Sequence, residues 1–188
     1  YFMYSLKDMM LGAEFDLKYG RWLRSLVFEY IYTKYQSGPY NHDRTENIGD
    51  HIAGMDDYYN HSIYTGWQHW GQVIGNPLYR SPIYNTDNSI DVRNNRFYAL
   101  HLGVEGSPTE RLDYRVLTTY QKGWGTYNNP FTRAYKNLSF LVEAKYKFNR
   151  NWTVRGGYAM DFGSEKMYGH NAGFQLTVTK SGLLTKKK

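Results

Sequence analysis

The strongest constraint on this chain is a pair of neighbouring segments in which apolar and polar residues alternate. In segment 140–148 the even-numbered positions are apolar or aromatic, and most odd-numbered positions are charged. Segment 152–162 repeats the pattern after the short polar stretch 149–151. A β-strand sends successive side chains to opposite faces, whereas a helix repeats about every 3.6 residues. The two segments therefore predict a β-hairpin with one apolar and one polar face.

Five further segments continue the pattern less regularly. They are residues 9–19, 21–35, 98–105, 112–120 and 172–178. The second of them has an open register, because Arg24 interrupts its apolar face. With the hairpin they make seven predicted strands of roughly 9–14 residues, and about 9–11 residues are enough to cross a bilayer at a tilt.

The apolar content of the chain is unusually aromatic. Aromatic residues make up 18% of the chain and include 20 Tyr, while long aliphatic runs are missing. No stretch approaches the ~20 consecutive apolar residues that a membrane helix needs. Aromatic excess on alternating strands is typical of outer-membrane barrels, whose lipid face is bordered by aromatic girdles. We therefore predict an all-β fold, a transmembrane antiparallel up-and-down β-barrel.

A soluble antiparallel sandwich is the alternative, since alternation alone fits either architecture. The polar faces favour the barrel, because their charged residues suit a water-filled lumen. These residues are Glu14, Asp16, Glu143, Lys145, Arg155 and Asp161.

The predicted connections alternate in length. Short turns fall near residue 20, at 107–110 and at 149–151, and longer connections at about 36–95, 123–136 and 163–168. Barrels have short periplasmic turns, longer extracellular loops and, in bacteria, an even strand number. We therefore expect residues 1–188 to form about seven C-terminal strands of one larger barrel domain, with further N-terminal strands as their partners.

Charge and motifs exclude several functions. The net charge of +6 includes the terminal Lys186, Lys187 and Lys188, so no nucleic-acid partner is predicted. The chain has no Cys and shows no zinc, calcium, P-loop or nucleophile-elbow motif. We expect no cofactor, no metal and no enzymatic activity.

The long connection at about 36–95 carries the candidate binding site. Its second half is rich in aromatic residues, which disordered segments lack, so we expect it to fold over the barrel mouth or into the lumen. Sugar rings stack on Trp or Tyr while polar side chains bind their hydroxyls. The candidate carbohydrate ligands are Tyr64, Trp67, His69, Trp70, Gln72 and Arg80. The alternative is that these aromatic residues pack the loop against the barrel wall.

Part of the chain resembles a known family. The sequences "GWQHWGQVIGNPL", "SPIYN", "RNNRFYALHLGVEG" and "YRVLTTYQKGWGTY" are similar to the C-terminal part of the capsule-assembly Wzi family of outer-membrane proteins. The resemblance implies a large barrel that acts as a surface lectin and not as an enzyme. The end of the chain, "SGLLTKKK", departs from the aromatic last residue of many outer-membrane barrels.

These observations predict a function and its rivals. The prediction is a barrel in the outer membrane of a Gram-negative bacterium that binds or anchors capsular or extracellular polysaccharide, with membrane lipid and the polysaccharide as partners. One alternative is an outer-membrane porin or transporter in which the long loop constricts the lumen. A lipid-modifying barrel enzyme is a third possibility, but the sequence shows no nucleophile and base for it.

Overall fold

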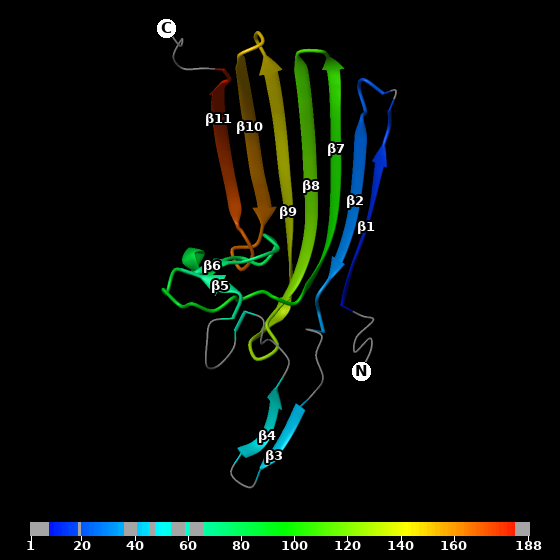
Figure 1. Ribbon diagram of the computed structural model, residues 1–188. Helices are drawn as coiled ribbons and strands as arrows, with labels where there is room; N and C mark the ends of the chain where they lie inside the picture. Colours follow the sequence, from blue (N-terminus) through cyan, green and yellow to red (C-terminus); the bar gives the residue numbers. More distant parts are fainter. Residues whose placement is uncertain are drawn as a thin grey trace.

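The computed structural model describes residues 8–18, 20–35, 41–45, 48–53, 59–60 and 66–182. It is an all-β structure built on one antiparallel sheet of seven strands in the order β1-β2-β7-β8-β9-β10-β11 (Figure 1). The strands are β1 (Met9–Asp16), β2 (Ser25–Tyr32), β7 (Phe97–Thr109), β8 (Leu112–Gly125), β9 (Pro130–Lys147), β10 (Trp152–Gly163) and β11 (His170–Lys180). The predicted all-β fold and antiparallel sheet are confirmed.

The long connection between β2 and β7 holds the remaining elements. They are the hairpin β3 (Asn41–Thr45) with β4 (Ile48–Ala53), the hairpin β5 (Gln68–His69) with β6 (Gln72–Val73), and the 3₁₀ turn η1 (Pro82–Tyr84). In the described part of the chain, no helix is long and apolar enough to cross a membrane.

Each strand of the large sheet pairs with the next one along the chain, apart from the long excursion between β2 and β7. The connections at one end of the sheet are residues 17–24, 110–111 and 148–151, and those at the other end are 33–96, 126–129 and 164–169 (Figure 1). The predicted alternation of lengths therefore holds for the long connection between β2 and β7 but not for the other two at its end. Strand β9 begins at Pro130, ten residues before the predicted start at 140, so the connection before it is only 126–129. The prediction missed this part because Arg133 and Lys136 interrupt the apolar pattern there.

One face of the sheet is apolar across all seven strands. A single row of cross-strand partners shows this. The row is Phe15, Leu26, Val104, Val116, Val142, Tyr158 and Phe174. The outer members of the row are far from buried, since Phe15 is 56% and Phe174 72% exposed. No second sheet among the described residues covers this face, because the other two sheets are two-stranded hairpins.

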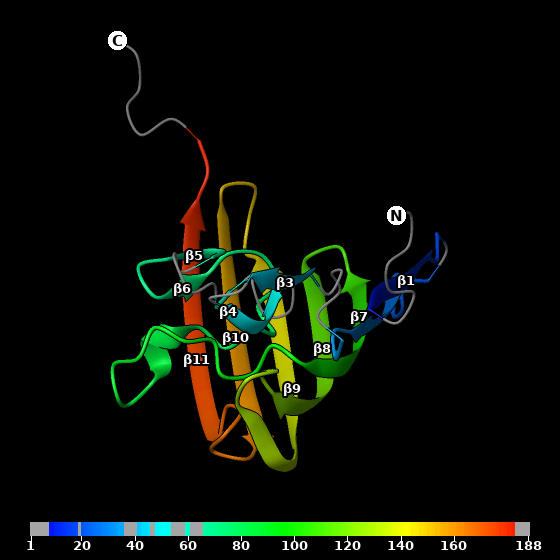
Figure 2. The same cartoon turned by 90° about the horizontal axis from the view of Figure 1, so that it is seen from below.

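The opposite face is polar, and the small core lies on it. Ile31, Phe97 and Ala99 are buried there beneath Leu78 and Tyr79 of the long connection. Figures 1 and 2 show that the segment from β5 to β7 crosses the ends of the strands from β11 towards β7. Part of the long connection, at Leu78 and Tyr79, therefore packs on the polar face of the sheet.

The sheet is open in the structure. Among the described strands, β1 has only β2 as a neighbour and β11 has only β10, so the sheet does not close into a barrel. The residues on both edge strands are exposed along their whole length.

Candidate functional site

Three connections meet at the long-connection end of the sheet and enclose a cleft of about 700 Å³. The long connection supplies most of its walls, and the β8–β9 and β10–β11 connections supply the rest. The residues that matter for its chemistry are Arg80, Tyr84, Asp87, Asp91, Arg93, Phe131, Glu165 and Lys166. The lining thus combines two aromatic rings with charges of both signs.

An amide pair holds one wall of this cleft. The side-chain Nδ2 of Asn60 donates to the carbonyl of Val92 at 2.9 Å, and the Val92 N–H donates to Asn60 Oδ1 at 2.8 Å. Val92 is fully buried. These two bonds tie together parts of the connection that are about thirty residues apart in sequence.

A second amide shapes the segment that follows η1. The Asn85 Nδ2 donates to the Ser89 carbonyl, the Ser89 hydroxyl and the Asp91 carbonyl at 2.9–3.1 Å. Asp87 forms an ion pair with Arg93 at the rim of the cleft. The N–H of Ser89, which donates to this carboxylate at 3.2 Å, is the main cause that holds the pKa of Asp87 below its usual value. Asp87 is therefore an anion at neutral pH.

Hydrogen bonds at Leu78 attach the long connection to β8 and to the β10–β11 connection. The Leu78 carbonyl accepts hydrogen bonds from Gln121 Nε2 at 3.0 Å and from the Tyr168 hydroxyl at 2.9 Å. The neighbouring Tyr79 packs on Tyr59 and Phe97, with ring centroids 4.3 and 5.0 Å apart. Burial raises the pKa of Tyr168, so its hydroxyl remains a donor at neutral pH.

The β5–β6 hairpin presents aromatic residues to solvent beside the cleft. Its two turn residues, Trp70 and Gly71, have φ angles of +50° and +71°, which is the pattern of a type I′ turn. Trp70 is 88% exposed and Trp67 is 58% exposed. The N–H of Ile83 donates to the Gly71 carbonyl at 2.9 Å. The hairpin is therefore held against η1, whose last residue lines the cleft.

The predicted ligand residues divide into two groups. Trp67, His69, Trp70 and Gln72 lie together on or beside the β5–β6 hairpin, where the rings of His69 and Trp70 meet edge to face at 6.2 Å. Only Arg80 lines the cleft, and its Nη2 donates to the Tyr84 carbonyl at 2.8 Å. Tyr64 lies outside the described residues.

Sequence reasoning missed the cleft residues supplied by the other connections. Phe131 lies on β9, and Glu165 and Lys166 lie in the β10–β11 connection. A signal for them was present, since in a sheet of consecutive antiparallel strands every second connection lies at the same end as the long loop. Residue type alone did not distinguish them from other surface positions.

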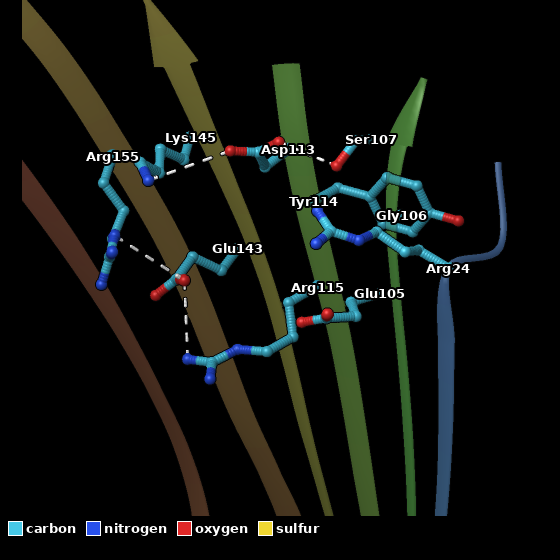
Figure 3. Close-up of a pocket in the computed structure, with 10 residues that line it drawn as sticks. All are labelled: Arg24, Glu105, Gly106, Ser107, Asp113, Tyr114, Arg115, Glu143, Lys145 and Arg155. Atoms are coloured by element: carbon cyan, nitrogen blue, oxygen red, sulfur yellow. Dashed lines mark hydrogen bonds and ion pairs between the residues drawn. The ribbon is translucent and has the colours of Figure 1, made fainter. Parts of the chain in front are cut away.

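The polar face carries a second group of charges, near the short turns (Figure 3). Glu143 lies between two guanidinium groups, 3.5 Å from Arg115 and 3.8 Å from Arg155. Asp113 lies 3.2 Å from Lys147 and 3.9 Å from Lys145, and it accepts a hydrogen bond from Ser107. A cavity of about 250 Å³ is lined by Glu143 and Asp113 together with Arg115, Arg155, Lys145, Ser107 and neighbouring residues. Glu143, Lys145 and Arg155 thus lie on the polar face, as the alternation predicted, and they form ion pairs there.

Metal binding has no support in the described residues. Among them, no group of three or more His, Asp or Glu side chains is placed to hold a metal ion.

Comparison of the chain with protein-family models, with curated proteins and with solved structures finds no match.

Proposed function

We propose that this chain is part of an outer-membrane β-barrel that binds surface polysaccharide in the cleft at its long-connection end and catalyses no reaction. The observation that carries the proposal is the division of the sheet into two faces. One face is apolar across seven strands, and the other is polar, bears ion pairs and leads to the cleft.

The dimensions of the sheet support membrane insertion. Strands β7 to β11 have 11–18 residues. With a rise of about 3.3 Å per residue, an 11-residue strand is about 36 Å long, and at a tilt of about 45° it spans about 25 Å. That is the height of the apolar band of an outer-membrane barrel.

The exposure of the apolar face also favours a membrane over a sandwich. In a sandwich the apolar faces of two sheets pack together at about 10 Å. Here Leu100, Leu102, Val142 and Tyr158 are 38–45% exposed although they lie on interior strands of the sheet. Lipid acyl chains would cover these side chains.

The cleft suits a carbohydrate. Its volume of about 700 Å³ lies within the range of about 300–1,000 Å³ that is usual for ligand sites. Tyr84 and Phe131 offer ring faces, and Arg80, Asp91 and Lys166 offer donors and acceptors for hydroxyl groups. Trp70 extends the aromatic surface outside the cleft through the contact of its hairpin with η1. A polymer could therefore lie along both, in agreement with the lectin function that the sequence resemblance implies.

The experiment is a titration of the detergent-solubilised protein with a panel of purified capsular polysaccharides. Loss of one aromatic contact, in the range of about 1 kcal/mol, corresponds to about fivefold in affinity. Tyr84→Ala should therefore weaken binding of the recognised polysaccharide about fivefold. Ile90→Ala is the matched control, because Ile90 is similarly exposed in the same connection but does not line the cleft.

A porin or transporter is the second candidate, and one observation favours it. The Leu78 region is bonded to the polar face, where it would narrow a lumen. If wild type binds no polysaccharide of the panel, and deletion of residues 66–92 increases single-channel conductance in a planar bilayer, the transporter function replaces the lectin function.

A further inference from the structure

Lysine and aromatic side chains occur together on the apolar face where β2, β7, β8 and β9 reach the long connections. One row of cross-strand partners runs Tyr32, Tyr98, Lys122 and Lys136. The next row towards the short turns is Tyr30, Leu100, Tyr120 and Leu138. Charge thus appears on this face at the border of its apolar part.

Trp124 is the centre of this group. Its ring lies 5.9 Å from that of Tyr98, and the Nζ atoms of Lys34 and Lys122 lie 4.7 and 5.6 Å from its centroid. Arg96 positions Lys34, because its Nε donates to the Lys34 carbonyl at 2.9 Å and its Nη1 donates to the Thr126 carbonyl at 3.2 Å. We call Lys34, Lys122, Lys136 and Trp124 the basic aromatic band.

The positive charge of this band is not compensated within the described part of the chain. Lys34, Lys122 and Lys136 form no ion pair with any residue that the structure describes, whereas on the polar face Asp113 alone is paired with two lysines. Two ammonium groups over one indole ring repel each other. An anion near both ammonium groups would be attracted to each and would offset their repulsion.

We propose that the basic aromatic band binds the phosphate of anionic lipid headgroups in the leaflet on the long-connection side. The inference rests on the membrane placement in the proposed function and names a lipid partner for it. Tyr and Trp concentrate at the headgroup level of membranes, and lysine stems lie along apolar surface while the ammonium reaches the polar region. Lysine binds phosphate as a point charge.

The position of the band selects a lipid phosphate over a soluble anion. Leu100 and Leu138, in the next row, are 38% and 43% exposed and continue the apolar face towards the short turns, Leu138 next to Lys136 and Leu100 next to Tyr98. A lipid bound here would place its phosphate at the lysines and its acyl chains along the apolar rows. A free phosphate would use only the first of these contacts.

Quenching of Trp124 fluorescence by brominated lipids tests the proposal. The protein is reconstituted in phosphatidylcholine vesicles that contain, at equal mole fraction, either brominated phosphatidylglycerol or brominated phosphatidylcholine. The contribution of Trp124 is obtained by comparison with Trp124→Phe. We expect the anionic lipid to quench Trp124 several-fold more effectively than the zwitterionic one. Inorganic phosphate should not remove this preference.

Substitutions identify the groups responsible. Each basic residue near a membrane surface contributes attraction equivalent to about fivefold in binding, so Lys34→Gln and Lys122→Gln should each reduce the lipid preference by up to about fivefold. Lys122→Arg should retain it, which separates charge from folding. Lys145→Gln, on the polar face, is the matched control and should leave the preference unchanged.

The outcomes of the quenching experiment distinguish the lipid-phosphate site from the membrane placement on which it rests. Equal quenching of wild-type Trp124 by both lipids, or an unchanged preference in the Lys34→Gln/Lys122→Gln double variant, would overturn the phosphate site while the membrane placement stands. Failure of both lipids to quench Trp124 would overturn the membrane placement and this site with it.

Discussion

Two glycines determine how buried amide side chains pack on the polar face, at the end of the sheet where the long connection lies. A Cβ on Gly123 would come within 2.3 Å of Asn94 Oδ1, and a Cβ on Gly163 within 2.0 Å of Asn137 Oδ1. Asn94 and Asn137 are both buried, and Asn94 Oδ1 accepts a hydrogen bond from the Gly125 N–H at 3.2 Å. The two glycines therefore make room for amide side chains where the strands meet the long connections. Nothing in the sequence pattern marks these pairs, because the partners are brought together by strand register.

Tyr168 gives a prediction at this scale. Burial raises the pKa of its hydroxyl in the folded protein, so the folded state favours the neutral form. This contribution to stability is complete below the ordinary tyrosine pKa of about 10 and is lost as the pH rises beyond it. We expect the Leu78 segment to become more accessible to protease above about pH 10.

Tyr168→Phe tests the cause. It removes the hydrogen bond to the Leu78 carbonyl and should lower the free energy of unfolding by about 0.5–1.5 kcal/mol at neutral pH. In the Tyr168→Phe variant, protease accessibility of the residues near Leu78 should also increase less at alkaline pH than in wild type. An alkaline profile identical to that of wild type would show that another group controls it.

Among the elements, the β5–β6 hairpin combines backbone strain with exposure. Trp70 occupies a left-handed conformation, which costs a non-glycine residue about 1 kcal/mol, and it is 88% exposed. Strain of this kind is often retained where a side chain has a function. Asn-Gly is the favoured pair for a type I′ turn, so Asn would fit the backbone of position 70 better.

Trp70→Asn should therefore stabilise the hairpin by about 1 kcal/mol while it weakens polysaccharide binding about fivefold. Amide hydrogen exchange of residues 68–73 measures the first effect, and titration with the polysaccharide measures the second. Unchanged affinity with a more protected hairpin would remove Trp70 from the binding surface and leave the cleft as the site.

The sequence predicted the strands well wherever one face is uniformly apolar. Alternation located β10 correctly at both ends to within a residue, and it placed Val142 and Tyr158 on one face. It failed for the first part of β9, because Lys136 belongs to the basic aromatic band on the otherwise apolar face. It left the register of β2 open, and the structure resolves it because Arg24 precedes the strand.

The candidate site was only partly predictable, for a related reason. Trp67, His69, Trp70 and Gln72 are close in sequence, and a local hairpin brings them together. Arg80 reaches Tyr84 through a turn of the chain, while Phe131 lies on β9 and Lys166 lies in the β10–β11 connection, far from Arg80 in sequence. Local composition identifies the first group, but the second depends on the order of the strands and the path of the long connection.

On the scale of the whole molecule, the central claim is that the apolar face lies in lipid and the polar face in water. Leu141 and Val142 make a matched pair for testing it, because they are adjacent aliphatic residues on opposite faces in the middle of β9. Leu141 pairs with Leu117 and Ala159 on the polar face, and Val142 pairs with Val116 and Tyr158 on the apolar face.

The most direct measurement is the accessibility of a spin label at each of these two positions in reconstituted vesicles. The label at Val142 should be relaxed by oxygen, which concentrates in the bilayer, and protected from a water-soluble nickel chelate. The label at Leu141 should show lower oxygen accessibility than Val142. Equal accessibility of the two labels to oxygen, with the nickel chelate reaching Val142 freely, would contradict the membrane placement and return the chain to the class of soluble β-proteins.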